Sequence, residues 1–318
     1  MSLPHSFFIG RGSKVAIPFD LAMMVIGSGG GGGDGNSPGG GGGAGALLDI
    51  TGSLLTSSNT TYTVTVGVPG KGSASSDQIS ESGNQSSFSN GTNILVAAYG
   101  GGRGGSFSGA AYGTSTGQSF GSGGGGSGPS NYNQKGYAGL GASLANTSGF
   151  ANFSSTVYAN DGYAWTGGGS YGYGGGGGGA GSAASSNTAG GAGLYRDWMG
   201  TNLEYAAGGN GANGAPSSQY LYSGDRTETI GSGGGGLNDG TRLQWNDADG
   251  MPGGVLIKIP KDIALEEVVC NTSGGLSYYT MYTGDPSTNT YQFTSPQIDN
   301  IADPYSAPYV FTFKMVAA

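Results

Sequence analysis

The sequence predicts an all-β protein, in which a glycine-rich body of β-strands and polyproline-II-type segments precedes a small C-terminal antiparallel β module. Short runs of β-branched and aromatic residues, bounded by turn residues, indicate strands. All but five of the 72 glycines lie between residues 27 and 254. The chain also carries 19 Tyr and 11 Phe but only 9% charged residues. Because disordered chains are usually rich in charge and poor in aromatic residues, this composition indicates a folded protein.

The glycine distribution divides the chain into three regions. Residues 1–22 are interpreted as an N-terminal attachment segment, 23–260 as the glycine-rich body and 261–318 as the C-terminal module. The last region has a composition close to that of ordinary globular proteins. Since a chain of this length is marginal for an independent core, we expect it to lean on the body or on a neighbouring subunit.

Five apolar islands before residue 261 read as strands. Tyr62–Val66 is the clearest, because it alternates Tyr, Val and Val with two threonines. The other four are residues 21–26, 46–50, 93–99 and 255–259. We predict that Met23–Ile26 pairs with Val255–Ile259, since pairing the two ends of the body would remove exposed strand edges.

The glycine runs between these islands leave two structures open. In polyproline II the chain has three residues per turn and no internal hydrogen bonds, so glycine segments in this form can pack closely and bond to neighbouring chains. Gly208, Gly211 and Gly214 follow such a spacing. The alternative is a set of long glycine loops over a β core.

After residue 260 the sequence contains four further apolar and aromatic islands separated by turn residues. They cover residues 265–270, 276–282, 290–293 and 309–316. Strands at this spacing favour a small antiparallel sheet or sandwich.

The composition excludes several classes of function. One cysteine and one histidine leave no disulfide framework, no cysteine- or histidine-rich metal site and no support for a histidine-based catalytic triad. Eleven basic against 19 acidic residues argue against a nucleic-acid surface, and the apolar runs are too short to span a membrane. We therefore expect no cofactor, no metal and no enzymatic activity.

Three local patterns resemble chemical motifs, and each has a simpler interpretation. Gly67–Ser73 is similar to a phosphate loop with its residue order broken, and we interpret it as a turn. Residues 246–250 (Asn-Asp-Ala-Asp-Gly) resemble part of a calcium loop but are read as a turn capped by aspartates. The candidates for the two carboxylates of a glycosidase are Asp161, Asp197, Glu204, Asp225 and Glu228, but the sequence places no two of them together, and few acidic residues lie in the body.

Aromatic residues flank the longer glycine runs of the body. Tyrosine and tryptophan beside glycine and serine are typical of antibody binding loops, where rigid rings supply contact area at low entropic cost. The alternative is that these rings cover the glycine segments and are buried. We predict receptor contacts at Tyr163, Trp165, Tyr171, Tyr173, Tyr195 and Trp198.

The order of elements in the body resembles the glycine-rich domain of tail-fibre and other virion structural proteins of tailed bacteriophages, especially those of marine cyanobacteria. An apolar strand runs into polyglycine at 23–33, a Tyr-Thr-Val-Thr-Val-Gly strand follows at 62–67, and a closing strand occupies 252–260. In composition and length the chain is also similar to the tail-fibre tip adhesins of T-even-like phages.

This resemblance implies a virion location, at the particle surface or tail, and the function of a tail-fibre or receptor-binding protein that mediates host attachment. The alternative is a capsid or tail decoration protein that stabilises the particle, and a polysaccharide depolymerase is a further one. Expected partners are other virion proteins, a host surface glycan or outer-membrane protein, and copies of the same chain in a homotrimer. Nucleic-acid binding and membrane insertion are not expected.

Overall fold

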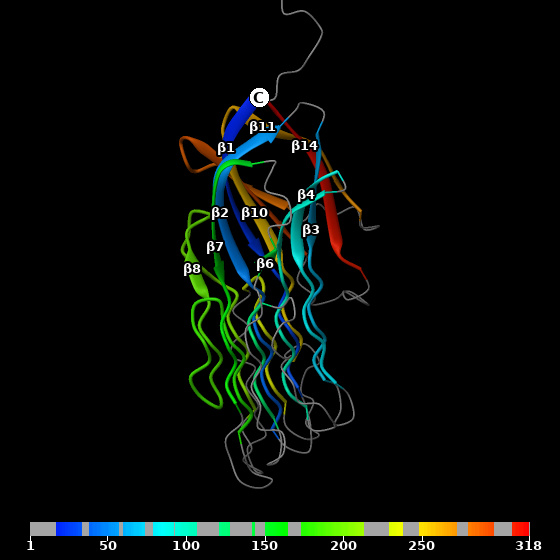
Figure 1. Ribbon diagram of the computed structural model, residues 1–318, viewed down its shortest axis with the longest axis vertical. Helices are drawn as coiled ribbons and strands as arrows, with labels where there is room; N and C mark the ends of the chain where they lie inside the picture. Colours follow the sequence, from blue (N-terminus) through cyan, green and yellow to red (C-terminus); the bar gives the residue numbers. More distant parts are fainter. Residues whose placement is uncertain are drawn as a thin grey trace, which may run out of the picture.

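A computed structural model describes residues 17–33, 38–56, 60–73, 79–91, 93–106, 121–127, 142–143, 150–164, 173–212, 229–237, 248–271, 279–295 and 307–317. The molecule is elongated, with β-sheets at one end and the glycine segments at the other (Figure 1). No helix occurs among these residues. The strands are β1 (Ile17–Ile26), β2 (Leu47–Thr56), β3 (Thr61–Val66), β4 (Ser86–Asn90), β5 (Asn93–Ala98), β6 (Ala142–Ser143), β7 (Phe150–Tyr158), β8 (Leu194–Arg196), β9 (Leu203–Tyr205), β10 (Gly254–Pro260), β11 (Ile263–Cys270), β12 (Tyr279–Tyr282), β13 (Thr288–Thr294) and β14 (Tyr309–Ala317).

Twelve of these strands form two six-stranded antiparallel sheets. Sheet A has the order β12-β13-β10-β1-β2-β7, and sheet B has the order β11-β14-β3-β4-β5-β6. The predicted pairing of the two ends of the body is confirmed, because β1 and β10 are antiparallel neighbours with Met23 opposite Ile257 and Val25 opposite Val255. The first residues of β1 come from the predicted N-terminal segment 1–22, which therefore contributes directly to sheet A.

The strands of residues 261–318 are antiparallel, as predicted, but they do not form a sheet of their own. β12 and β13 extend sheet A beyond β10, while β11 and β14 extend sheet B beyond β3. The physical reason is that 58 residues are marginal for an independent core, so the strands of this region complete the edges of sheets that the body begins.

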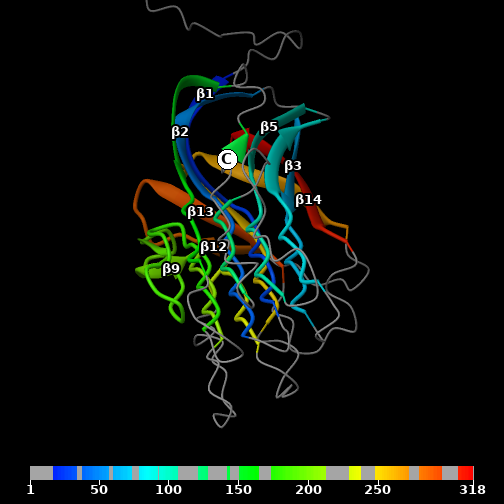
Figure 2. The same cartoon turned by 60° about the horizontal axis from the view of Figure 1, so that its bottom comes forward.

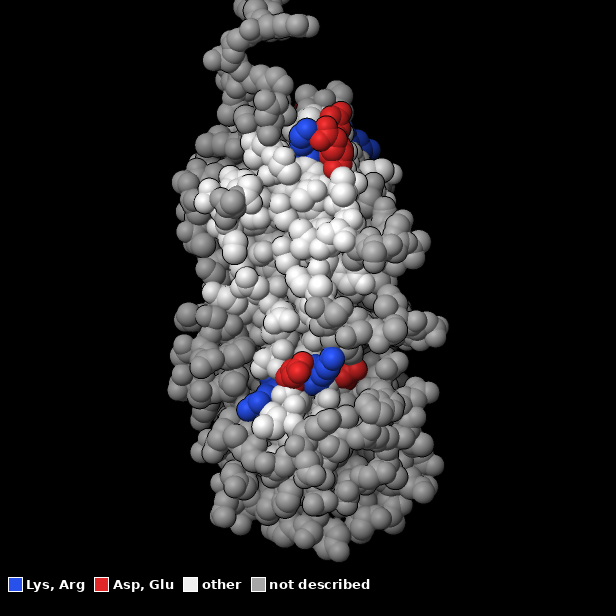
Figure 3. Space-filling view, turned by 90° about the vertical axis from the view of Figure 1, so that its right-hand side faces the viewer, with Lys and Arg blue, Asp and Glu red and all other residues white. Residues whose placement is uncertain are grey.

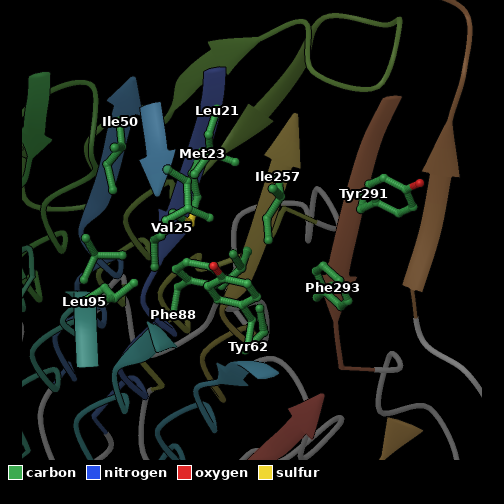
Figure 4. Packing of buried hydrophobic residues seen from close by; sticks show 14 of the residues in the cluster. Leu21, Met23, Val25, Ile50, Tyr62, Phe88, Leu95, Ile257, Tyr291 and Phe293 are labelled. Carbon is green, nitrogen blue, oxygen red and sulfur yellow. The ribbon is translucent and has the colours of Figure 1, made fainter. Parts of the chain in front are cut away.

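The main core lies between the inner faces of the two sheets (Figure 4). Strand alternation places Met23 and Val25 of β1 and Ile257 of β10 on the face that meets sheet B. Aromatic rings fill the centre: Tyr62 stacks on Phe88 with ring centroids 5.3 Å apart. This core joins strands from the whole length of the chain into one packed unit.

The glycine segments form a bundle of extended chains that run side by side below the sheets (Figure 2). In segment 27–33 every third N–H group donates to the same neighbouring segment, as Gly27, Gly30 and Gly33 do to the carbonyls of residues 46, 43 and 40. The N–H groups between them donate in the same period to segments 80–84 and 248–251. A period of three is that of polyproline II, so the structure decides between the two alternatives in favour of the bundle.

Two segments of the bundle are completely surrounded. The carbonyls of 27–33 accept hydrogen bonds from three further segments, at residues 70–73, 101–104 and 234–237. Segment 39–46 likewise has six neighbours, which it bonds alternately through N–H and C=O groups. The backbone polar groups of both segments are thus satisfied without any regular sheet.

Close approach, and not unusual backbone dihedrals, explains why the bundle is built of glycine. A Cβ atom added to Gly42 would overlap the backbone carbonyl of Gly30 in the adjacent segment. In contrast, the described glycines with φ in the left-handed region are Gly91, Gly200 and Gly231. Gly208 and Gly211 follow the predicted spacing of three, since an added Cβ would meet the carbonyls of Gly177 and Gly174, respectively. Gly214 lies outside the described residues.

Candidate functional site: an aromatic hairpin and its pocket

The six aromatic residues predicted to bind a receptor do not form one cluster. Tyr173 is 43% exposed and precedes Gly174, which bonds to Ala212 at the end of the bundle remote from the sheets. Tyr195 is 57% exposed and belongs to β8, beside sheet A. Tyr163 is half-buried in a bundle segment, where its backbone bonds to Gly176 and Gly126. Trp165 and Tyr171 lie outside the described residues.

Strands β8 and β9 form a hairpin that covers the outer face of sheet A. Tyr205 of β9 belongs to a second, smaller apolar cluster with Met24, Ile26, Leu47 and Leu256 of the sheet. Arg196 fixes the hairpin further through a 2.8 Å ion pair with Asp49 of β2 and by lying 5.3 Å above the Tyr158 ring. The hairpin is therefore held by both apolar packing and charge.

Trp198 follows β8 and helps to hold the hairpin against sheet A. Its ring packs against the second cluster and lies 5.3 Å below the Lys258 ammonium of β10. Half-buried in this way, Trp198 presents less of its ring to solvent than Tyr195 does. Composition alone does not separate the ring that packs on sheet A from the ring that faces solvent, which is why both residues are predicted receptor contacts.

A pocket of about 690 Å³ opens between the hairpin and the outer face of sheet A. Tyr195 and Glu204, which are opposite each other in the hairpin register, stand on one side of it. Gln292 and Thr294 of β13 line the other side, and Ile230 and Pro252 contribute apolar surface. Sequence reasoning missed this site, since no pattern in the sequence indicates that 195–205 meets 292–295.

Tyr205 is the most perturbed titratable group beside this pocket. Its side chain is 2% exposed, and its hydroxyl has no hydrogen-bond partner among the described residues. Burial, and after it the negative charge of Asp197, raises the pKa of Tyr205 to about 12 from its ordinary value of 10.0.

We expect this shift to make stability fall at alkaline pH. The unfolded chain ionises Tyr205 near pH 10, whereas the folded protein keeps it protonated up to about pH 12. Its contribution is therefore fully present below pH 10 and is lost as the pH rises through 12. Tyr205→Phe should keep or raise the free energy of unfolding at pH 7, by up to about 1 kcal/mol, because an unpaired buried hydroxyl is removed. Denaturant titrations of both proteins at pH 7 and pH 11 test this, and an equal alkaline loss in the variant would contradict it.

Of the described carboxylates considered for a glycosidase pair, two lie on one hairpin and the third lies elsewhere. Asp197 and Glu204 both lie on the β8–β9 hairpin, near Tyr205, while Asp161 lies in a bundle segment where its backbone carbonyl accepts a hydrogen bond from Ala184. Asp225 and Glu228 are outside the described residues. Across the described ranges there is no group of three or more histidine, cysteine or acidic side chains placed to hold a metal ion.

The two motif-like segments of the body belong to the bundle. The N–H groups of Gly70 and Ser73 donate to the carbonyls of Gly29 and Gly32, so this stretch is a bundle segment and not the predicted turn. Asp249, the described acidic residue of the calcium-like pattern, accepts a 2.6 Å hydrogen bond from the N–H of Gly72. In both segments, the described residues take part in hydrogen bonds that satisfy backbone N–H groups of the bundle.

Charged side chains are sparse on the described surface. The face in Figure 3 shows two small groups of mixed sign, one near the sheets and one over the bundle, with uncharged surface between them. The described part of the chain contains no helix that is long and apolar enough to cross a membrane.

Comparison with known proteins supports the description of the body. Among curated proteins, none is similar enough to this chain to count as a match. The profile of the glycine-rich domain family matches residues 13–260, which include β1, the whole bundle and β10. Because this match covers well over half of the chain, the protein belongs to the glycine-rich domain family.

Proposed function

We propose that the protein is a virion structural protein of a tailed phage, and that it acts as a tail-fibre or receptor-binding protein that attaches the particle to the host surface. Two facts support this proposal. The chain belongs to the glycine-rich domain family, and its element order resembles that of phage virion proteins. The proposal includes assembly with other virion proteins and with two further copies of the chain.

The observation that carries the proposal is the combination of a rigid bundle with exposed rings. Hydrogen bonds between neighbouring segments of the chain hold the described glycine segments along their length, so the described residues at the end remote from the sheets are firmly positioned. Tyr173 lies at that end and Tyr195 lies beside the sheets, and both rings are exposed. Exposed tyrosines on a rigid scaffold lose little entropy on binding, which suits attachment to a surface.

We expect the double variant Tyr173→Ala/Tyr195→Ala to reduce adsorption to host cells more than tenfold, equivalent to about 1.4 kcal/mol. Both rings are at the surface, so the free energy of unfolding should change by less than about 0.5 kcal/mol per site. The loss is measured by labelling the purified full chain with a fluorophore and quantifying the amount that binds to host cells.

Val269→Ala is the matched control, because Val269 is an equally exposed apolar side chain on the edge strand β11. It should leave adsorption unchanged. Unaltered adsorption in the tyrosine variant, together with many copies of the protein bound to purified particles, would instead support a decoration protein.

A further inference from the structure

The pocket beside the β8–β9 hairpin has the size and the composition of a small-ligand site. Its volume of about 690 Å³ lies within the range of about 300–1,000 Å³ that such sites occupy. Apolar surface from Ile230 and Pro252 combines there with a few polar side chains from different parts of the chain. The hairpin and sheet A are held together by the second apolar cluster, so the two walls of the pocket are fixed relative to each other.

One wall presents an aromatic ring beside a carboxylate. Tyr195 and Glu204 are directly opposite in the antiparallel hairpin, and such cross-strand pairs place their Cβ atoms about 5 Å apart. Glu204 is oriented by the N–H of Gly193, which donates to its Oε1 at 2.9 Å. No described residue donates to Oε2, which leaves this oxygen to accept a hydrogen bond from a ligand.

The other wall offers groups that both donate and accept hydrogen bonds. Gln292 and Thr294 of β13 face the hairpin, and Asn202 lies at its turn. Amides and hydroxyls of this kind match ligand hydroxyl groups, which also donate and accept. A ring, a carboxylate and neutral amides around one pocket are therefore suited to a ligand with an apolar face and several hydroxyls.

The charge of the pocket lining restricts the class of ligand that it can bind. Among the described residues that line the pocket, Glu204 is the charged side chain, and the whole chain carries a net charge of -8. An anionic ligand would bring like charges together without a basic partner in this described lining. We propose that the pocket binds one residue of a neutral saccharide, with the apolar face of the sugar against the Tyr195 ring and neighbouring hydroxyls donating to Glu204.

Saturation-transfer NMR on the full chain tests this directly with glucose, galactose, mannose and N-acetylglucosamine at millimolar concentration. At least one of these sugars should receive saturation, and glucuronic acid should receive less. Tyr195→Ala and Glu204→Gln should each weaken the binding by about tenfold or more. Glu204→Gln keeps an oxygen for the N–H of Gly193, so an unchanged unfolding curve will show that the fold is intact.

Val269→Ala is the control, because this side chain is also exposed but is no part of the pocket and has no place in the proposed attachment surface. It should bind sugar as the unaltered protein does. The inference is overturned if none of the four sugars receives saturation, or if Tyr195→Ala and Glu204→Gln both bind within twofold of the unaltered protein.

The biological meaning of the pocket rests on the proposed attachment function, and the two can fail separately. Loss of sugar binding in Glu204→Gln with unchanged host adsorption would keep the saccharide site and remove its role in attachment. Adsorption that depends on Tyr195, without binding of any of the four sugars, would keep attachment and overturn the saccharide site.

Discussion

Replacing Gly42 by alanine should lower the free energy of unfolding by about 4 kcal/mol or more, an exceptional loss for one methyl group. Gly42 lies in a surrounded segment of the bundle, and the new Cβ would overlap the Gly30 carbonyl, far inside the 3.0 Å that Cβ atoms keep from other atoms. The segment cannot move aside. Its N–H donates to Gly234 at 2.8 Å and its carbonyl accepts from Gly209 at 2.9 Å, so any shift breaks hydrogen bonds on two sides. Denaturant unfolding of the purified variant measures the loss.

Gly91→Ala is the matched control for this substitution. Gly91 lies at the turn between β4 and β5 with a φ of 56°, and an added Cβ there would meet no atom within 4 Å. Its replacement should cost only about 1–2 kcal/mol, the penalty of a left-handed backbone conformation. If the two variants were equally stable, close packing of the glycine segments would not be what selects glycine in this protein.

The strands with strong alternation could be predicted from the sequence. Tyr62–Val66 places Tyr62, Val64 and Val66 in the core and leaves the two threonines partly exposed, as its pattern requires. The pairing of β1 with β10 was also predictable, because both strands are apolar and bracket the glycine-rich body. In these cases the side chains themselves carry the information.

Elements without such a pattern could not be predicted. β7 (Phe150–Tyr158) is an edge strand with three polar residues at its centre and an irregular register near Asn152, whose φ is 50°. The stretch 193–199 reads as a single helical turn or a loop, yet it contains β8, which is stabilised by its partner β9 and by sheet A. Polyglycine has no side-chain pattern. A bundle differs from loops only in the hydrogen-bond register between neighbouring segments, which the sequence does not show.

The candidate site was predictable only in part. Composition identified Tyr173 and Tyr195, which are exposed, together with Trp198, which packs against sheet A. The pocket could not be found, because it depends on β13 joining sheet A next to β10. That neighbour relation arises from the way the C-terminal strands complete both sheets, which the division into three regions did not anticipate.

The shared core between the two sheets leads to a second large expected effect. Phe293 of β13 is fully buried, and its ring centroid lies 5.2 Å from that of Phe311 and 5.3 Å from that of Phe313, both in β14 of sheet B. Phe293→Ala should cost about 3–5 kcal/mol through lost burial and the cavity left behind. Phe293→Leu keeps most of the volume and should cost less than about 1.5 kcal/mol.

Unfolding of Phe293→Ala, followed by tryptophan fluorescence and by circular dichroism, tests whether the C-terminal strands share one core with the body. All three tryptophans, Trp165, Trp198 and Trp245, precede residue 261, so their signal reports on the body, while circular dichroism reports on all strands. Because β13 pairs with β10 and its rings pack between the sheets, Phe293→Ala should shift both signals to lower denaturant by the same amount. A circular-dichroism transition that moves while the fluorescence transition stays in place would show that the C-terminal strands unfold on their own, and would overturn the single shared core.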